Sequence, residues 1–108
     1  MSLKIVVTPE FAKRVKQLSK KYKNISKDLK DLYEVINKNP RSGVDLGSNC
    51  YKIRLANSSI PTGKSGGFRV IIYLVENKDI VRLLYIFSKR EQDNISDNEL
   101  RELISKNL

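Results

Sequence analysis

Two basic side chains on one predicted strand are the first residues in this sequence that suit chemistry on a charged substrate. The stretch 51–55 alternates apolar and basic residues, so Lys52 and Arg54 lie on the same face of an extended strand. Their Cα atoms are then roughly 6.5–7 Å apart. The alternative interpretation is that Lys52 and Arg54 form only the solvated side of a half-buried strand.

Further basic residues stand near the ends of the two apolar runs that follow. Arg69 lies at the start of the first run, where a charged side chain is costly if it is fully buried. We therefore expect Arg69 to reach a groove or a partner. Lys89 and Arg90 close the second run, and Lys64 lies in the glycine-rich loop before Arg69. If the three strands pair as a meander, these cations converge on one face of the sheet.

A cluster of this kind suits binding of phosphate groups. If the substrate is RNA, cleavage without a metal ion needs a deprotonated 2′-hydroxyl, stabilisation of the phosphorane charge and a proton for the leaving oxygen. An arginine stays charged, and its guanidinium group can donate two parallel hydrogen bonds to phosphate oxygens, so Arg69 and Arg90 suit the stabilising role. Neighbouring positive charges lower the pKa of Lys52, which makes it the best available base. Tyr73 is a candidate for stacking on RNA, with core packing as the alternative.

The composition excludes several other kinds of chemistry. The 108 residues include no histidine and a single cysteine, Cys50, which excludes histidine-ligated metal sites, histidine-based catalysis and an internal disulfide. We therefore expect no metal and no cofactor. Twenty-one Lys and Arg against 12 Asp and Glu give a net charge of +9, which favours a polyanionic partner such as nucleic acid. A merely soluble basic surface is the alternative.

The apolar runs are too short for a membrane span, the longest being 70–75. Residues 1–4 also lack the apolar core of a secretory signal, so we expect a cytoplasmic protein with no membrane partner. The 40% of hydrophobic and 31% of charged residues fit one folded domain over residues 1–108.

The hydrophobic pattern predicts the elements that must position the cations. A cap and a proline at Thr8-Pro9 begin a helix, and Ser96 begins another with a capping box that includes Glu99. A polar connection that contains Gly43 and Gly47 is expected before the strand 51–55. Helices are predicted after Thr8, over 25–36 and after Ser96, and strands over 3–7, 51–55, 68–75 and 80–87. The expected fold is an α+β domain with a mostly antiparallel four-stranded sheet, packed by an N-terminal helical hairpin and followed by a C-terminal helix.

The assembled pattern resembles the RelE/ParE superfamily of toxins from type II toxin–antitoxin systems. The order of elements matches that superfamily, so the resemblance covers nearly the whole chain. The glycine-rich loop looks most like the RelE branch with its HigB-type members. The likeness is carried, in order, by Tyr51-Lys52-Ile53-Arg54-Leu55, Gly67-Phe68-Arg69-Val70-Ile71-Ile72-Tyr73 and Ser88-Lys89-Arg90-Glu91.

The resemblance implies an mRNA interferase, a ribosome-dependent endoribonuclease that inhibits translation. It implies three partners, namely an acidic cognate antitoxin, the ribosome and mRNA. Arg54 stands where the family has a second lysine, and the family's catalytic tyrosine falls near Ser96, so the acid–base assignment stays open. The candidate catalytic residues are Lys52, Arg54, Arg69 and Arg90, and the candidate RNA-binding residues are Lys64, Lys89 and Tyr73.

Two other functions stay open on the sequence alone. A ParE-like inhibitor of DNA gyrase shares the fold but acts by protein–protein contact, so it would not need the cationic residues for activity. A non-catalytic RNA-binding module would use the same cations only to hold phosphate. Salt-sensitive RNA binding without cleavage on translating ribosomes would favour the second alternative.

Overall fold

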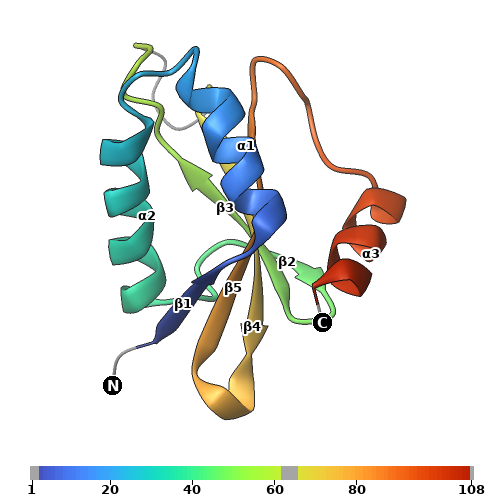
Figure 1. Cartoon of the computed structure of the whole chain (residues 1–108). Coiled ribbons are helices and arrows are strands. Elements are labelled where there is room, and N and C mark those ends of the chain that lie inside the picture. Colours follow the sequence, from blue (N-terminus) through green and yellow to red (C-terminus); the bar gives the residue numbers. More distant parts are fainter. Residues whose placement is uncertain (1–2, 62–65, 108) are drawn as a thin grey trace.

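Five strands form one mixed sheet in the computed structural model, which describes residues 3–61 and 66–107 (Figure 1). The order across the sheet is β1-β5-β4-β3-β2. β1 runs parallel to β5, whereas the other three pairings are antiparallel. The strands are β1 Lys4–Val7, β2 Val44–Gly47, β3 Cys50–Leu55, β4 Phe68–Val75 and β5 Ile80–Ser88.

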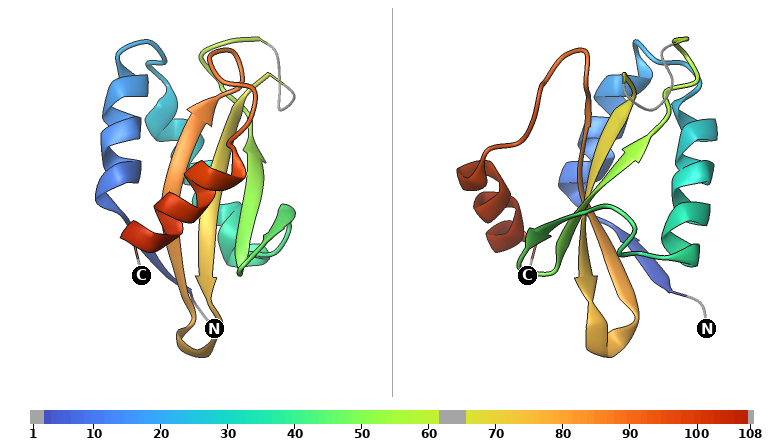
Figure 2. Two further views of the ribbon diagram at one scale, coloured as in Figure 1. Left: turned by 90° about the vertical axis from the view of Figure 1, so that its right-hand side faces the viewer. Right: turned by 180° about the vertical axis from the view of Figure 1, so that it is seen from behind.

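Two helices cover one face of the sheet, and a third lies against part of the other face (Figure 2). A short 3₁₀ turn, η1 (Glu76–Lys78), joins β4 to β5. Within the described ranges, no helix is long and apolar enough to cross a membrane. The helices are α1 Pro9–Ser19, α2 Ile25–Lys38 and α3 Asp97–Lys106.

The predicted cap at the start of α1 is confirmed and also ties α1 to the sheet. Thr8 Oγ1 accepts a hydrogen bond from the Phe11 backbone N–H at 3.3 Å and donates one to the Leu83 carbonyl at 2.6 Å. Pro9 occupies the first helical turn, where its missing N–H leaves no bond unmade. The cap therefore fixes where α1 leaves β1 and crosses β5.

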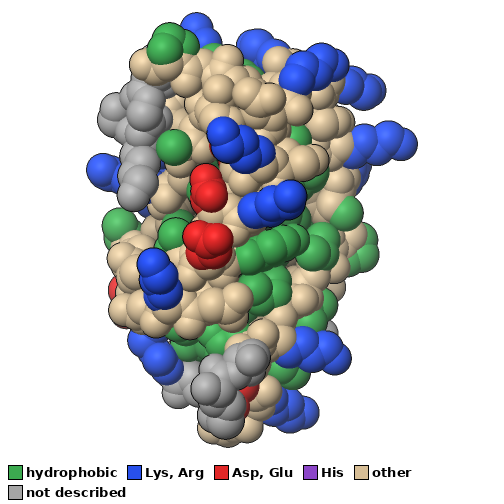
Figure 3. All heavy atoms as spheres, turned by 90° about the vertical axis from the view of Figure 1, so that its left-hand side faces the viewer, with side chains coloured by type: hydrophobic (Ala, Val, Ile, Leu, Met, Phe, Trp, Pro, Cys, Tyr) green, Lys and Arg blue, Asp and Glu red, His purple; other side chains and the backbone are tan. Residues whose placement is uncertain are grey.

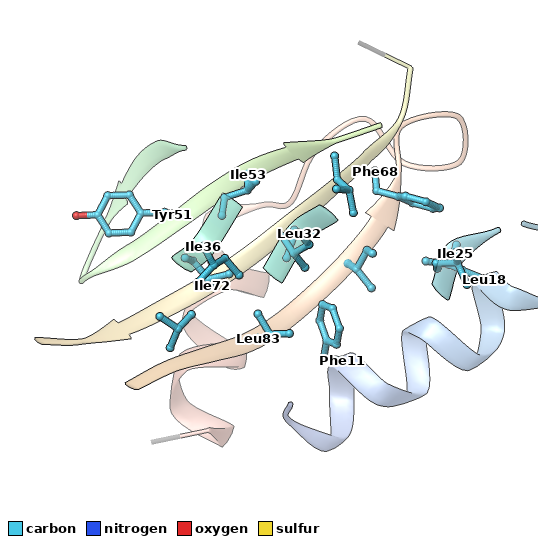
Figure 4. Packing of buried hydrophobic residues seen from close by; sticks show 14 of the residues in the cluster. Phe11, Leu18, Ile25, Leu32, Ile36, Tyr51, Ile53, Phe68, Ile72 and Leu83 are labelled. Carbon is cyan, nitrogen blue, oxygen red and sulfur yellow. The ribbon is translucent and has the colours of Figure 1, made fainter. Parts of the chain in front are cut away.

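The main core lies between α1, α2 and the sheet (Figure 4). Burial of one such large apolar side chain contributes roughly 1.5–3 kcal/mol to stability. This core covers one face of the sheet with α1 and α2, so the opposite face is free of these two helices. Its buried members include Phe11, Leu18, Ile25, Leu32, Ile36, Ile53, Phe68, Ile72 and Leu83.

The prediction of a four-stranded sheet is wrong by one strand, because residues 44–47 form β2 at the sheet edge. β2 is short and mostly exposed, so it lacks the alternation that reveals a half-buried strand. Ser48 and Asn49 have φ values of 53° and 61°, which is the left-handed backbone of a tight two-residue hairpin turn into β3. The mostly antiparallel sheet, the helical hairpin and the C-terminal helix are confirmed.

Candidate nucleic-acid interface

The sheet face that points away from α1 and α2, here called the outer face, has two different halves. In the apolar half, α3 packs over Cys50, Ile71 and Leu84, which are at most 1% exposed. The cationic half consists of Lys52 and Arg54 on β3, Arg69 on β4 and Lys89 after β5. The alternation predicted for residues 51–55 is thus confirmed, since Tyr51, Ile53 and Leu55 point into the main core instead.

Two arginines face each other directly in the cationic half. Arg54 pairs with Arg69 across β3 and β4, where opposite Cβ atoms are about 4.5–5.5 Å apart. Like charges in this position destabilise a sheet. Arg69 is only 5% exposed, and its Nη1 donates to the Phe68 carbonyl at 3.1 Å. Burial lowers the pKa of Arg69, and the charge of Arg54 lowers it further. A bound anion would relieve this repulsion.

Lys52 lies beside this arginine pair on the same strand face. Its Nζ donates to Asn94 Oδ1 at 3.1 Å. Burial is the first cause that lowers the pKa of Lys52, and the charges of Lys89, Arg69 and Arg54 lower it further, in that order. The direction of the shift is the predicted one, but burial contributes to it as well as the neighbouring charges.

Lys89 lies within this cationic group, whereas Arg90 lies at its rim. The Lys89 backbone N–H donates to the Gly67 carbonyl at 2.9 Å, and its Nζ lies 3.5 Å from the Asp93 carboxylate. Arg90 is exposed, and its backbone N–H donates to Ser88 Oγ at 3.3 Å. The charge of Arg90 is not among those that shift the pKa of Lys52.

One other predicted contact residue, Tyr73, does not join this cluster. Tyr73 pairs with Cys50 across the strands and packs in the apolar half. It follows Arg69 by four residues along β4, a distance of roughly 13 Å at about 3.3 Å per residue. Core packing, the alternative role for Tyr73, therefore fits this position better than stacking on RNA. Lys64 lies outside the described residues.

Two polar residues on the segment that links β5 to α3, Gln92 and Asn94, lie beside the cations and were not among the predicted site residues. Gln92 Nε2 donates to the Asn94 carbonyl at 3.0 Å, and Tyr85 Oη donates to Gln92 Oε1 at 3.4 Å. No sequence pattern reveals such amide contacts, because they depend on the path of the chain after β5. Ser96, which stands near the family's tyrosine position, uses its Oγ to cap α3 by accepting from the Glu99 N–H at 3.1 Å.

This arrangement gathers several positive charges on one face of the sheet, with Arg54 exposed and Arg69 buried. Such a group of charges suits the phosphates of a single RNA strand. Lys52 and Arg54 also border a hollow of about 510 Å³ at the β3 edge, where α2 contributes Val35 and the start of β2 contributes Val44. In the part of the chain that the structure describes, no group of three or more His, Cys, Asp or Glu residues is placed to hold a metal ion.

Comparison with known proteins gives one family and one fold. The family model described as RelE toxin of the RelE/RelB toxin–antitoxin system matches residues 4–107. An arginine double mutant of the E. coli toxin RelE in the free state has a TM-score of 0.62 and 17% sequence identity, with 100% of both chains covered. The intact E. coli RelBE toxin–antitoxin complex has a TM-score of 0.60 and 19% identity, covering 79% of this chain and 94% of that chain. No curated protein matches the chain by sequence.

Proposed function

Because the chain belongs to the RelE toxin family, we propose that this toxin is a ribosome-dependent endoribonuclease that cleaves mRNA. In this proposal residues 1–108 form a single toxin domain that acts in the cytoplasm, where ribosomes translate. The observation that carries the proposal is the cross-strand pair Arg54–Arg69 beside Lys52, whose pKa is lowered. This set combines a base with fixed positive charge on one face of the sheet.

In the proposed reaction, Lys52 accepts the proton of a 2′-hydroxyl, and the oxygen attacks the adjacent phosphorus. Arg54 and Arg69 hold the non-bridging oxygens and stabilise the charge that develops on them. The bond to the 5′ oxygen then breaks, and this oxygen takes a proton from solvent or from a group of the ribosome. Lys89 and Arg90 contact phosphates on either side of the cleaved bond.

The proposed protein partner is an acidic antitoxin that neutralises the +9 charge of the chain. The E. coli RelBE complex, in which the toxin of similar fold is bound by its antitoxin, supports this partner. Co-expression with the neighbouring reading frame should recover a stable complex that weakens as salt is raised.

The test is cleavage of mRNA on programmed ribosomes by the Arg69→Ala and Lys52→Ala variants. Loss of one group that stabilises transition-state charge costs about 10²–10³ in rate, and loss of a general base about 10²–10⁴. Arg101→Ala is the matched control, because it removes one exposed arginine from α3. Circular dichroism melting of each variant shows whether it is folded.

The alternatives predict different results. If folded Arg69→Ala and Lys52→Ala variants arrest growth like the parent, the nuclease site is wrong, and the gyrase mechanism is favoured. If the parent binds RNA in a salt-sensitive way but never cleaves mRNA on translating ribosomes, the protein is a binding module.

A further inference from the structure

A buried tyrosine, Tyr22, joins the turn between α1 and α2 to the strands that carry the cations. It is only 2% exposed, and its Oη lies 3.2 Å from Ser88 Oγ, within hydrogen-bond distance. Its ring meets the ring of Phe68 edge to face, with the ring centres 5.5 Å apart. A phenylalanine would fill the same space in the core, so the hydroxyl itself needs an explanation.

The two residues that Tyr22 contacts face each other at the ends of two strands. Phe68 begins β4 and pairs with Ser88, which ends β5. Because successive side chains of a strand point to opposite faces, the next residues along the chain, Arg69 and Lys89, point to the outer face. Tyr22 therefore supports, from the inner side of the sheet, the cross-strand pair that lies next to these cations.

Ser88 is also the base of the turn that follows β5. The Ser88 hydroxyl that meets Tyr22 accepts a hydrogen bond from the Arg90 N–H at 3.3 Å. The Ser88 carbonyl accepts from the N–H groups of Glu91 and Gln92, both at 3.0 Å. Because Ser88 is fully buried, these bonds tie the exposed turn to a fixed point in the core.

A second contact joins the same two segments at the surface. Lys21 Nζ lies 3.2 Å from a carboxylate oxygen of Glu91, and this hydrogen bond is the first cause that raises the pKa of Lys21. Figure 3 shows Lys and Arg side chains projecting from the upper end of the molecule, where Figure 1 places the turn between α1 and α2. Like charges at one end repel each other, so a basic turn there needs an attachment. Exposed ion pairs contribute little, which makes the buried contact of Tyr22 with Ser88 the stronger attachment.

We propose that Tyr22 is a positioning residue, whose hydroxyl holds Ser88 and thereby fixes the turn after β5 against the phosphates of the RNA strand. Tyr22 lies on the inner side of the sheet, away from the outer face, so it acts only through that turn. The inference rests on the proposed function, because it takes RNA as the ligand of Lys89 and Arg90 in the turn.

The position of the turn also affects the ionisation of Lys52. Lys89 comes first among the charges that lower the pKa of Lys52, followed by Arg69 and Arg54, and Lys52 Nζ donates to Asn94 Oδ1. If the turn moves away, the effect of Lys89 on this pKa decreases, while the effects of the two strand arginines remain. A loosened turn therefore changes the pH dependence of cleavage, which a loss of stability alone does not do.

The test uses Tyr22→Phe, which keeps the ring contact with Phe68 and removes only the hydroxyl. Tyr33→Phe, which removes a hydroxyl from a half-buried side chain on α2, is the matched control. Amide hydrogen exchange of the full chain, read by NMR, reports on the turn. Cleavage of mRNA on programmed ribosomes over a range of pH reports on the reaction, and circular dichroism melting shows that each variant is folded.

In Tyr22→Phe, the N–H groups that bond to Ser88 should exchange about 2- to 10-fold faster, as expected for the loss of one neutral hydrogen bond. The kcat/KM for cleavage should fall by about 10- to 100-fold, chiefly through KM, because the displaced groups bind substrate phosphates. The rising limb of the pH profile should move to higher pH, as in Lys89→Gln. Combined with Lys89→Gln, Tyr22→Phe should move the limb no further. Lys21→Gln should have smaller effects of the same kind, and Tyr33→Phe should match the parent.

The proposal is overturned if exchange in the turn is the same in Tyr22→Phe and in the parent, since the hydroxyl then does not hold the turn. It is also overturned if the turn loosens while kcat/KM and the pH profile stay those of the parent. A further shift of the limb on top of Lys89→Gln would contradict it as well, because the effect would not pass through Lys89. Failure of the proposed function looks different, because the parent itself then cleaves no mRNA, and the positioning role falls with it.

Discussion

The apolar half and the cationic half of the outer face are built on the same strands but differ in what covers them. On β4, Ile71 is fully buried under α3, whereas Arg69 lies two residues away on the same face with its charge opposite Arg54. In the first half the side chains stabilise the fold by excluding water. In the second half like charges are held together at a cost, as is common where a protein binds a ligand.

The two halves also differ in the direction of their pKa shifts. Cys50 in the apolar half and Lys52 in the cationic half are two residues apart on one face of β3. Burial is the first cause of both pKa shifts, and it favours the neutral form of each group. It therefore raises the pKa of the Cys50 thiol to about 11 and lowers the pKa of the Lys52 ammonium. Burial keeps the thiol protonated and unreactive, and it moves the amine toward the form that a base requires.

The largest expected difference between the halves is in stability. Ile71→Ala should lower the free energy of unfolding by about 2–5 kcal/mol, because it opens a cavity in a fully buried site. Arg69→Met should leave that free energy unchanged or raise it, since an apolar side chain of similar length removes the repulsion with Arg54. Urea denaturation measures both. A loss as large for Arg69→Met as for Ile71→Ala would mean that Arg69 is a structural residue.

Alkaline unfolding tests the opposite shifts on β3. Between pH 9 and 11 the unfolded chain releases the Cys50 proton while the folded chain keeps it, so stability is lost as pH rises. By pH 10.5 this loss is on the order of 2 kcal/mol. Lys52 acts in the other direction. Because folding lowers its pKa, the folded chain releases the Lys52 proton first, and stability rises as the pH rises toward the pKa of Lys52 in the unfolded chain. Cys50→Ala should therefore flatten the alkaline decline in urea-denaturation series, and an unchanged slope would contradict a buried thiol.

Side-chain alternation and helix caps allowed most of the fold to be predicted from the sequence. Thr8 and Ser96 mark their helices because a cap needs only residues a few positions apart. β2 was missed because an exposed edge strand has no buried face to pattern its sequence.

The candidate site follows the same division between local and long-range information. Alternation placed Lys52 and Arg54 together, and strand pairing brought Arg69 beside them. The polar contact between Lys52 and Asn94, and the different positions of Lys89 and Arg90, depend on how the chain turns after β5. No periodic pattern encodes that turn.

A smaller effect is expected at the cap of α3, the helix that covers the apolar half. Ser96→Ala removes the hydroxyl that accepts from the Glu99 N–H and should cost about 1 kcal/mol of stability. Cleavage on ribosomes should stay near the parent rate, because Ser96 Oγ is engaged at the helix start. A large loss of cleavage in a variant that melts like the parent would instead place Ser96 in the reaction.

The smallest effect is a shift in the pH dependence of cleavage when a neighbouring charge is removed. Lys89 is the first among the charges that lower the pKa of Lys52, so Lys89→Gln should move that pKa back toward its usual range. At any pH below the pKa, a smaller fraction of Lys52 is then deprotonated, and the rising limb of the rate profile should move to higher pH. Lys106→Gln, which removes an exposed lysine from α3, is the control and should leave the profile in place. Arg54→Gln should shift the limb in the same direction by less, because Arg54 comes last among the charges that act on Lys52. If the limb stays in place in both variants while their rates fall, Lys52 is not the base, and the cationic half contributes only binding of the RNA.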